Sequence, residues 1–249
     1  DDYIWMKDYL QLDGCAYRLI PIKYKAKNPR DPYEMGRVDP EYAYKTIMKW
    51  DWGNSGDPNM YHDVETRRNS VGYRSNITRA AEALTMAGEF KKAEQLLDLG
   101  MEKMPLDIFG HYSMIEPFVT GYYEVNKQDK ARKLLDGVIK KYQEELDHYK
   151  ALTQNEQTTI RMDIIAAVER YRSLVRVPIY YEDDKTVVKH LNIFNSYVKA
   201  FPLYYSADEL LNEDGSTQME VIQAIQEERD ATRLDSIKQS MPMQLDSIE

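Results

Sequence analysis

The chain has 249 residues, of which 43% are hydrophobic and 30% charged, and its formal net charge at pH 7 is −9. This composition predicts a globular protein with a substantial core, and the acidic balance argues against nucleic-acid binding, which needs a basic face. The longest apolar run has only five residues, Ile164 to Val168, and is far too short to cross a membrane. The single cysteine, Cys15, excludes an internal disulfide and a cysteine metal cluster.

Residues 1–70 are expected to form an adaptor segment made of one short strand, loops and one helix. Residues 15–25, CAYRLIPIKYK, alternate in polarity and predict a short extended segment. Asp39-Pro40 is a good helix start, because Asp caps a helix and Pro suits its first position, and this helix should run to about Lys49. Residues 50–63, WDWGNSGDPNMYHD, predict a loop that carries two tryptophans.

A helical hairpin is predicted next, and it is repeated once. Residues 80–105, AAEALTMAGEFKKAEQLLDLGMEKMP, read as two short helices around a turn and match the spacing of a tetratricopeptide repeat. Gly88 stands where the first helix must end, in a left-handed conformation that costs glycine little. A looser copy follows 38 residues later, with Asn126 at the turn and with Pro117 inside a first helix that should therefore start late or kink. The apolar and small positions at which these helices should cross are Ile77, Ala80, Ala81, Leu84, Ala93, Leu97 and Gly100, then Ile115, Phe118, Val119, Tyr122, Ala131, Leu135 and Val138.

A third helical pair is expected to cap the two repeats. Apolar residues step along one helix face from Ile160 to Val175, and Pro178 should end that helix. A second amphipathic stretch runs from Val187 to Phe201 and should stop at Pro202. Two repeats alone bury too little apolar surface, so this pair would close the stack.

The chain is therefore expected to be mainly α, with a tetratricopeptide-like α-α superhelix and a short irregular or extended N-terminal segment. The repeats and their capping pair should occupy residues 71–205. Residues 206–249 should hold a charged helix, from about Gln218 to Lys238, and a polar tail.

Motifs for catalysis, cofactor binding and metal binding are absent from the sequence. There is no G-x-S-x-G and no glycine-rich phosphate loop, and the four histidines, His62, His111, His148 and His190, are scattered. The Asp- and Asn-rich loop at residues 51–63 is better explained by turns than by a metal site, and acidic runs elsewhere by solvated helix faces than by a glycosidase-like carboxylate pair. We expect no catalytic residue, no cofactor and no metal.

The C-terminal tail contains Leu-Asp-Ser-Ile twice. Asp-Ser followed by an aliphatic residue resembles the acceptor motif of a bacterial O-glycosylation system, which makes Ser236 and Ser247 candidate acceptors. Two Leu-x-x-Ile steps are also ordinary amphipathic helix, and this simpler interpretation is the stronger one.

The N-terminal third carries a family resemblance. The segments DYLQLDGCAYRLIPIK, GRVDPEYAY and KWDWGN, followed by DPNMYHDVETRR and YRSNITRAAEAL, resemble the soluble C-terminal portion of a family of multispanning bacterial membrane proteins of unknown function. The membrane part of that family resembles GT-C-type glycosyltransferases and is related to protein O-mannosyltransferases. The family-like positions are Tyr17, Arg18, Trp52, Gly53, Tyr61, Asp63, Arg67 and Arg74. We favour the interpretation that they lock the N-terminal segment onto the first repeat, because Arg and aromatic residues commonly hold loops on scaffolds.

This resemblance implies a location and a division of labour. In such enzymes the catalytic acidic residue and the lipid-linked sugar site belong to the membrane half, so this chain should not itself transfer a sugar. The implied location is the extracytoplasmic (periplasmic) face of a bacterial inner membrane, as the soluble part of a multispanning protein.

Three functions follow from these observations. The leading hypothesis is a non-catalytic interaction and positioning domain that binds an acceptor polypeptide or its own membrane half, because a tetratricopeptide stack curves into a groove. The groove candidates are Arg79, Glu82, Tyr122 and Tyr123. One alternative is a structural, self-associating domain that uses the apolar residues Tyr3 to Met6, and another is a glycan-binding or carbohydrate-active module that uses Trp50, Trp52 and the Asp-rich loop.

Overall fold

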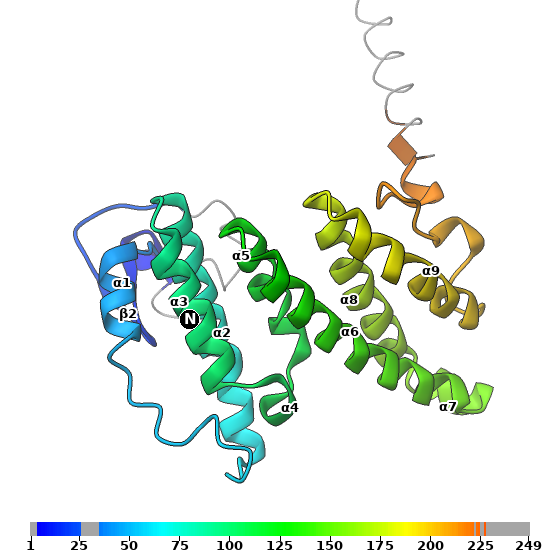
Figure 1. Ribbon diagram of the computed structural model, residues 1–249, viewed down its shortest axis with the longest axis horizontal. Helices are drawn as coiled ribbons and strands as arrows, with labels where there is room; N and C mark the ends of the chain where they lie inside the picture. The colour runs from blue at the N-terminus through cyan, green and yellow to red at the C-terminus, as the bar shows by residue number, and fades with distance from the viewer. Residues whose placement is uncertain (1–3, 26–34, 222, 225–226, 228–249) are drawn as a thin grey trace, which may run out of the picture. The chain divides into compact units, whose positions relative to one another are not determined.

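The computed structural model describes residues 4–25, 35–221, 223, 224 and 227, and its fold is mainly α, as predicted. The chain divides into two compact units, residues 1–145 and residues 146–249, which are described in turn (Figure 1).

The N-terminal segment of the first unit folds as a β-hairpin followed by a helix. Its elements are the 3-10 helix η1 (Ile4–Tyr9), the strands β1 (Leu10–Asp13) and β2 (Ala16–Leu19), and the helix α1 (Pro40–Ile47). The strands are antiparallel, with Leu10 opposite Leu19. The single extended segment predicted at residues 15–25 is therefore wrong in extent: the extended chain begins at Leu10, because Gly14, with a φ of 67°, turns it back on itself. Asp39 caps α1 as predicted.

The helices α2 (Val64–Met86) and α3 (Phe90–Lys103) form the first predicted hairpin. The side chain of Asp63 caps α2 by accepting a hydrogen bond from the backbone N–H of Thr66 at 2.8 Å. Gly88 has a φ of 78°, and the chain reverses there as the sequence predicts. The buried face of α2 carries Ile77, Ala80, Ala81 and Leu84.

A second hairpin follows a short connection. The elements are α4 (Leu106–Phe109), the 3-10 helix η3 (Tyr112–Met114), α5 (Glu116–Glu124) and α6 (Gln128–Ala151). Pro117 lies in the first turn of α5, so the helix starts late and has no internal kink. Asn126 takes the left-handed turn position with a φ of 58°. Helix α3 approaches α5 closely, since a Cβ placed on Gly100 would lie 2.7 Å from the Phe118 ring.

The second unit contains the predicted helical pair. The elements after α6 are α7 (Gln154–Thr159), α8 (Arg161–Tyr180), α9 (Asp184–Ala200) and the 3-10 helix η4 (Ala207–Glu209). Pro178 does not end α8 as predicted, because it lies in the last turn and the helix continues to Tyr180. The chain leaves the helix at Glu182, whose φ is 54°, and Asp183 donates its N–H to the Pro178 carbonyl at 2.8 Å.

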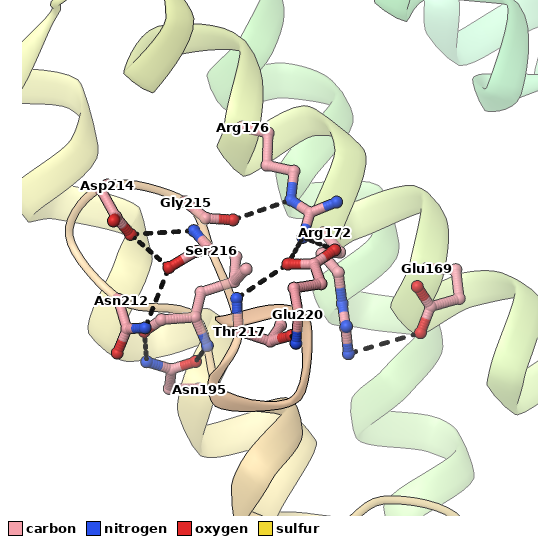
Figure 2. A network of polar contacts seen from close by, with 11 residues as sticks. Glu169, Arg172, Arg176, Asn195, Asn212, Asp214, Gly215, Ser216, Thr217 and Glu220 are labelled. Atoms are coloured by element: carbon pink, nitrogen blue, oxygen red, sulfur yellow. Dashed lines mark hydrogen bonds and ion pairs between the residues drawn. The ribbon is translucent and has the colours of Figure 1, made fainter. Parts of the chain in front are cut away.

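A polar network holds the loop after η4 against α8 and α9 (Figure 2). The guanidinium of Arg176 donates to both carboxylate oxygens of Glu220 at 2.8 Å and to the Gly215 carbonyl at 3.0 Å. The Asn195 side chain bonds both the N–H and the carbonyl of Leu211, each at 2.9 Å. These contacts fix the point at which the C-terminal helical turns begin.

The C-terminal helix starts where the sequence predicts. The side chain of Thr217 accepts the N–H of Glu220 at 3.1 Å, while the Glu220 carboxylate accepts the N–H of Thr217 at 2.8 Å, which is a reciprocal helix cap. The chain is helical from Gln218 to Val221 and at the described positions up to Glu227. The rest of the predicted helix lies outside the described residues.

Candidate functional site

A groove runs between α2 and α5, which are the first helices of the two hairpins. Its volume is about 470 Å³. Part of its lining consists of small side chains, which leave room between the two helices: Ser75 and Thr78 of α2 and Thr120 of α5. Its charged residues are Arg79, Glu82, Glu116 and Glu124, so the groove is acidic overall. A groove with small lining residues and acidic walls suits a chain segment that carries N–H donors or positive charge.

The structure separates the four residues predicted to face this groove. Arg79 and Glu82 line it. Tyr122 and Tyr123 do not, because each is only 4% exposed and belongs to the core face of α5. Tyr122 points away from the groove-lining residues Thr120 and Glu124, which lie two positions before and after it, whereas Tyr123 is kept out of the groove lining by its burial in the core.

Tyr122 has a structural role in the contact between the two hairpins. Its hydroxyl donates to the carboxylate of Asp98 on α3 at 2.9 Å, and Lys130 of α6 binds the same carboxylate at 2.7 Å. Burial and the nearby charge of Asp98 raise the pKa of Tyr122 well above its usual value. Lys130 also reaches Glu94 at 2.7 Å, and this bond lowers the pKa of that carboxyl.

Arg79 joins the groove to the N-terminal segment. Its guanidinium donates to the Tyr17 hydroxyl at 3.0 Å and to the carbonyls of Met35 and Gly36 at 2.8 and 2.9 Å. Arg79 and Glu82 also line a second, smaller cavity, of about 290 Å³, beside Arg37. The Arg79 side chain therefore holds the segment in place and borders the groove at the same time.

Arg74 is fully buried within the first unit. It donates to the carbonyls of Gly110 at 2.6 Å, Met104 at 2.8 Å and His111 at 3.4 Å. Met104 and Gly110 end α3 and α4, and the carbonyl ends of helices attract positive charge. Burial lowers the pKa of Arg74 to about 10. Arg74, a family-like position, thus has a structural role: its hydrogen bonds join the C-terminal ends of α3 and α4.

The other family-like positions have separate surroundings. Arg18 pairs with Asp13 at 2.6 Å and lies over the Tyr42 ring, which joins the hairpin to α1. Gly53 donates its N–H to Asp51 at 3.0 Å in the loop, where its φ is 51°. Tyr61 is 84% exposed. The structure does not bring these residues together into one site.

An aromatic pocket of about 360 Å³ lies where the loop after α1 meets α2. Its aromatic wall consists of Trp50, Trp52 and Tyr73, whose ring centroids lie 5.4 to 5.8 Å apart in edge-to-face contacts. The remaining lining residues are Cys15, Asp51, Ser55, His62, Thr66, Asn69, Ser70, Met104 and Phe109. The pocket therefore combines an aromatic wall with several polar groups.

The loop wall of the pocket is pinned to the helices at two points. The His62 ring shares a hydrogen bond with the Ser55 carbonyl at 3.0 Å, and its centroid lies 4.7 Å from that of Phe109. Gly56 approaches α3 so closely that a Cβ would lie 2.3 Å from the Glu102 carbonyl oxygen. The pocket is thus formed by packing that is already in place.

The sequence predicted part of these two sites. Trp50 and Trp52 were identified, but Tyr73 and Asn69 were not, since they belong to a helix that begins after the loop. No sequence signal pairs Tyr73 with the tryptophans. Ser236 and Ser247 lie outside the described residues.

Two further observations concern the described part of the chain. Within it, no three His, Cys, Asp or Glu side chains are grouped so as to hold a metal ion. None of its helices combines the length and apolar character needed to cross a bilayer.

Comparison with known proteins gives one match. No curated protein and no solved structure matches the chain. A family model described as TMEM260-associated domain 2 matches residues 1–42, which cover the β-hairpin, Tyr17, Arg18 and the start of α1. The N-terminal segment is therefore loosely linked to a TMEM260-type family.

Proposed function

We propose that this chain is a non-catalytic interaction and positioning domain that holds an extended polypeptide segment in the groove between α2 and α5. The observation that supports this function most directly is the groove itself, with its small lining residues and acidic walls. Helical hairpins of the tetratricopeptide type use the same inner face to bind extended chains.

The chemistry of the groove suggests what the polypeptide should carry. Glu82 is exposed, and Glu116 is partly exposed at the start of α5. The donors of Arg79 are already engaged with Tyr17 and with two backbone carbonyls, and its single positive charge leaves the three carboxylates of the lining in excess. A segment with Lys or Arg residues and free backbone N–H groups fits best, and its affinity should fall with added salt.

The proposed setting is the extracytoplasmic face of a bacterial inner membrane, beside a GT-C-type glycosyltransferase-like membrane half. This setting rests on the sequence resemblance, and the family match adds only a loose link between residues 1–42 and a TMEM260-type family. In it, the domain would recruit or orient the acceptor polypeptide, while the membrane half would carry out the transfer.

Peptide selection followed by a charge-reversal pair tests the groove. Random twelve-residue peptides displayed on phage are selected on the wild-type chain, and the affinity of recovered peptides is measured by fluorescence anisotropy. Glu82→Lys/Glu116→Lys should weaken binding by at least about tenfold at low salt. The matched control is Glu65→Lys/Glu213→Lys, because both of its residues are exposed, Glu65 occupies the first helical turn of α2, and neither lines the groove. Recovery of no peptide, or equal loss in both double variants, would contradict the proposal.

A second candidate function is supported by the N-terminal segment. Large apolar side chains are exposed there: Trp5 is 74% exposed, Leu19 57% and Ile22 51%. Such a surface suits a brace that contacts the membrane half or a second copy. Sedimentation equilibrium over a concentration series tests self-association, and Trp5→Ser/Ile22→Ser should dissociate any dimer. A monomer at every concentration would rule out the second copy.

A further inference from the structure

The aromatic pocket has features of a ligand site that the groove does not explain. It opens beside exposed groups, including Cys15, Asp51 and Asn69, and its back wall is formed by indole and phenol rings. Its volume of about 360 Å³ lies within the range of small-molecule sites, which are largely apolar with a few placed polar groups. We infer that this pocket binds a neutral saccharide, with one face of a sugar ring on the aromatic wall.

The packing of the three rings excludes a cage for a quaternary ammonium group. Such a cage needs space for the cation between ring faces. Here the centroids lie 5.4 to 5.8 Å apart, so the centre of the triangle that they form lies only about 3 Å from each centroid, and a methylated nitrogen does not fit between the rings. The rings instead pack edge to face on one another, with interplanar angles of 62° to 74°, so a sugar ring can place its C–H groups on the face of one ring while the other two rings border it.

The charges of the lining exclude a phosphorylated ligand. Its one acidic side chain is Asp51, and the lining contains neither Lys nor Arg. A nucleotide or a free phosphate would therefore meet a carboxylate with no neutralising group. A ligand with several hydroxyls and no negative charge fits this lining.

Polar groups of the pocket remain open to such hydroxyls. One oxygen of Asp51 accepts the N–H of Gly53, and its other oxygen has no partner among the described residues. The Asn69 amide, which can both donate and accept, also has none among them.

Two further groups are both shielded from solvent and unpaired within the described chain, namely the indole N–H of Trp52 and the hydroxyl of Ser55. Unpaired buried polar groups are unfavourable, and a ligand hydroxyl that enters beside the loop would satisfy them.

The tryptophans themselves supply the first readout. The chain has three tryptophans, and Trp5 lies outside the pocket, so Trp5→Phe leaves only the two pocket indoles to report binding. In that background, methyl glycosides of glucose, galactose, mannose and N-acetylglucosamine are titrated to about 50 mM while fluorescence is recorded. At least one should give a saturable change.

Cys15 supplies an independent second readout. It is exposed, it lines the pocket and it is the only cysteine of the chain. The glycoside that binds should slow alkylation of Cys15 by iodoacetamide over the same concentration range. Asn69→Ala should weaken binding about tenfold in both readouts, through the loss of its hydrogen bonds. Asn192→Ala is the matched control, since Asn192 is exposed on α9 in the second unit and should have no effect.

Other outcomes overturn the inference. If no glycoside changes either readout, the pocket is not a saccharide site. Protection of Cys15 by cyclohexanol as strong as that by the best glycoside would show plain apolar binding, and protection by inorganic phosphate would show an anion site. The groove variant Glu82→Lys/Glu116→Lys should bind the glycoside normally, so failure of the groove proposal and failure of this one are distinguishable.

Discussion

The groove and the aromatic pocket lie on two faces of the same helix, α2, but they are built in different ways. The groove is made of regular helix faces, and its shape comes from small side chains such as Ser75 and Thr78. The pocket is made of a loop that packs against the helix, and its shape comes from three large rings. A repeat pattern can therefore foretell the groove, whereas the pocket depends on how an irregular segment is pinned.

Three consecutive residues of α2 show how one helix serves both sites. Tyr73 lines the pocket, Arg74 is buried, and Ser75 lines the groove. Successive side chains of an α-helix point about 100° apart, so neighbours in sequence reach different faces. Arg74 is thus the shared support of the two sites.

Replacing Arg74 should reduce the free energy of unfolding more than any other change, and it should impair the groove and the pocket alike. Arg74→Met leaves the carbonyls of Met104 and Gly110 without their donor, so we expect a loss of about 3 kcal/mol or more of unfolding free energy. Arg74→Lys should be nearly as damaging, because one ammonium group cannot span both helix ends. Urea unfolding followed by tryptophan fluorescence measures this, since all three tryptophans belong to the first unit. A variant with wild-type stability would show that the hydrogen bonds of Arg74 to the two helix ends are dispensable.

Gly100→Ala should damage the groove and leave the pocket intact. The added Cβ would meet the buried Phe118 ring at 2.7 Å and push α5 away from α3, at a cost of about 1–3 kcal/mol. Peptide affinity should fall while glycoside binding is retained. Gly72→Ala is the matched control, because its Cβ would point into open space and an exposed helical Gly→Ala change stabilises by about 0.5–1 kcal/mol. Equal stability of the two variants would contradict the close crossing.

The hydrogen bond between Tyr122 and Asp98, which joins α5 to α3, should make the free energy of unfolding depend on pH. The folded state holds the Tyr122 proton at a pH where the unfolded phenol, with a pKa of about 10, has lost it. Its contribution to stability is therefore complete below pH 10 and declines above it, by about 1.4 kcal/mol per pH unit. Tyr122→Phe should cost about 1 kcal/mol at pH 8, through the lost bond to Asp98, and should flatten the alkaline decline. Urea midpoints between pH 8 and 11 measure both effects, and parallel curves for the two proteins would contradict this account.

The regular part of the fold was accessible from the sequence because each signal was local. Gly88 and Asn126 marked the turns, and the small residue Gly100 marked a helix crossing. Arg79 and Glu82 both line the groove, because residues three positions apart lie on the same face of a helix, and their role in binding stays a prediction. Tyr122 was misassigned because an amphipathic ring suits either face, and only the crossing of α3 and α5 decides which one it takes.

The pocket was only half predictable for a different reason. Trp50 and Trp52 were visible in an unusual loop, but their partner Tyr73 comes from a helix turn that carries no local signal for that contact. The residues that hold the loop against α3 could not be predicted from the sequence either. Nothing in the loop composition indicates that Gly56 must lie against the Glu102 carbonyl rather than simply form a turn.

Gly56→Ala should have the smallest effect on stability and the most selective effect on function. The new Cβ would lie 2.3 Å from the Glu102 oxygen, and since that oxygen belongs to helix backbone, the loop must move instead. The loop is on the surface, so we expect a loss of less than about 1 kcal/mol. Movement of the loop would shift Trp52 and Ser55, so glycoside protection of Cys15 should be lost, while peptide binding in the groove is unchanged. If Gly56→Ala instead weakens both activities equally, the two faces of α2 are coupled through the first unit and cannot be treated as separate sites.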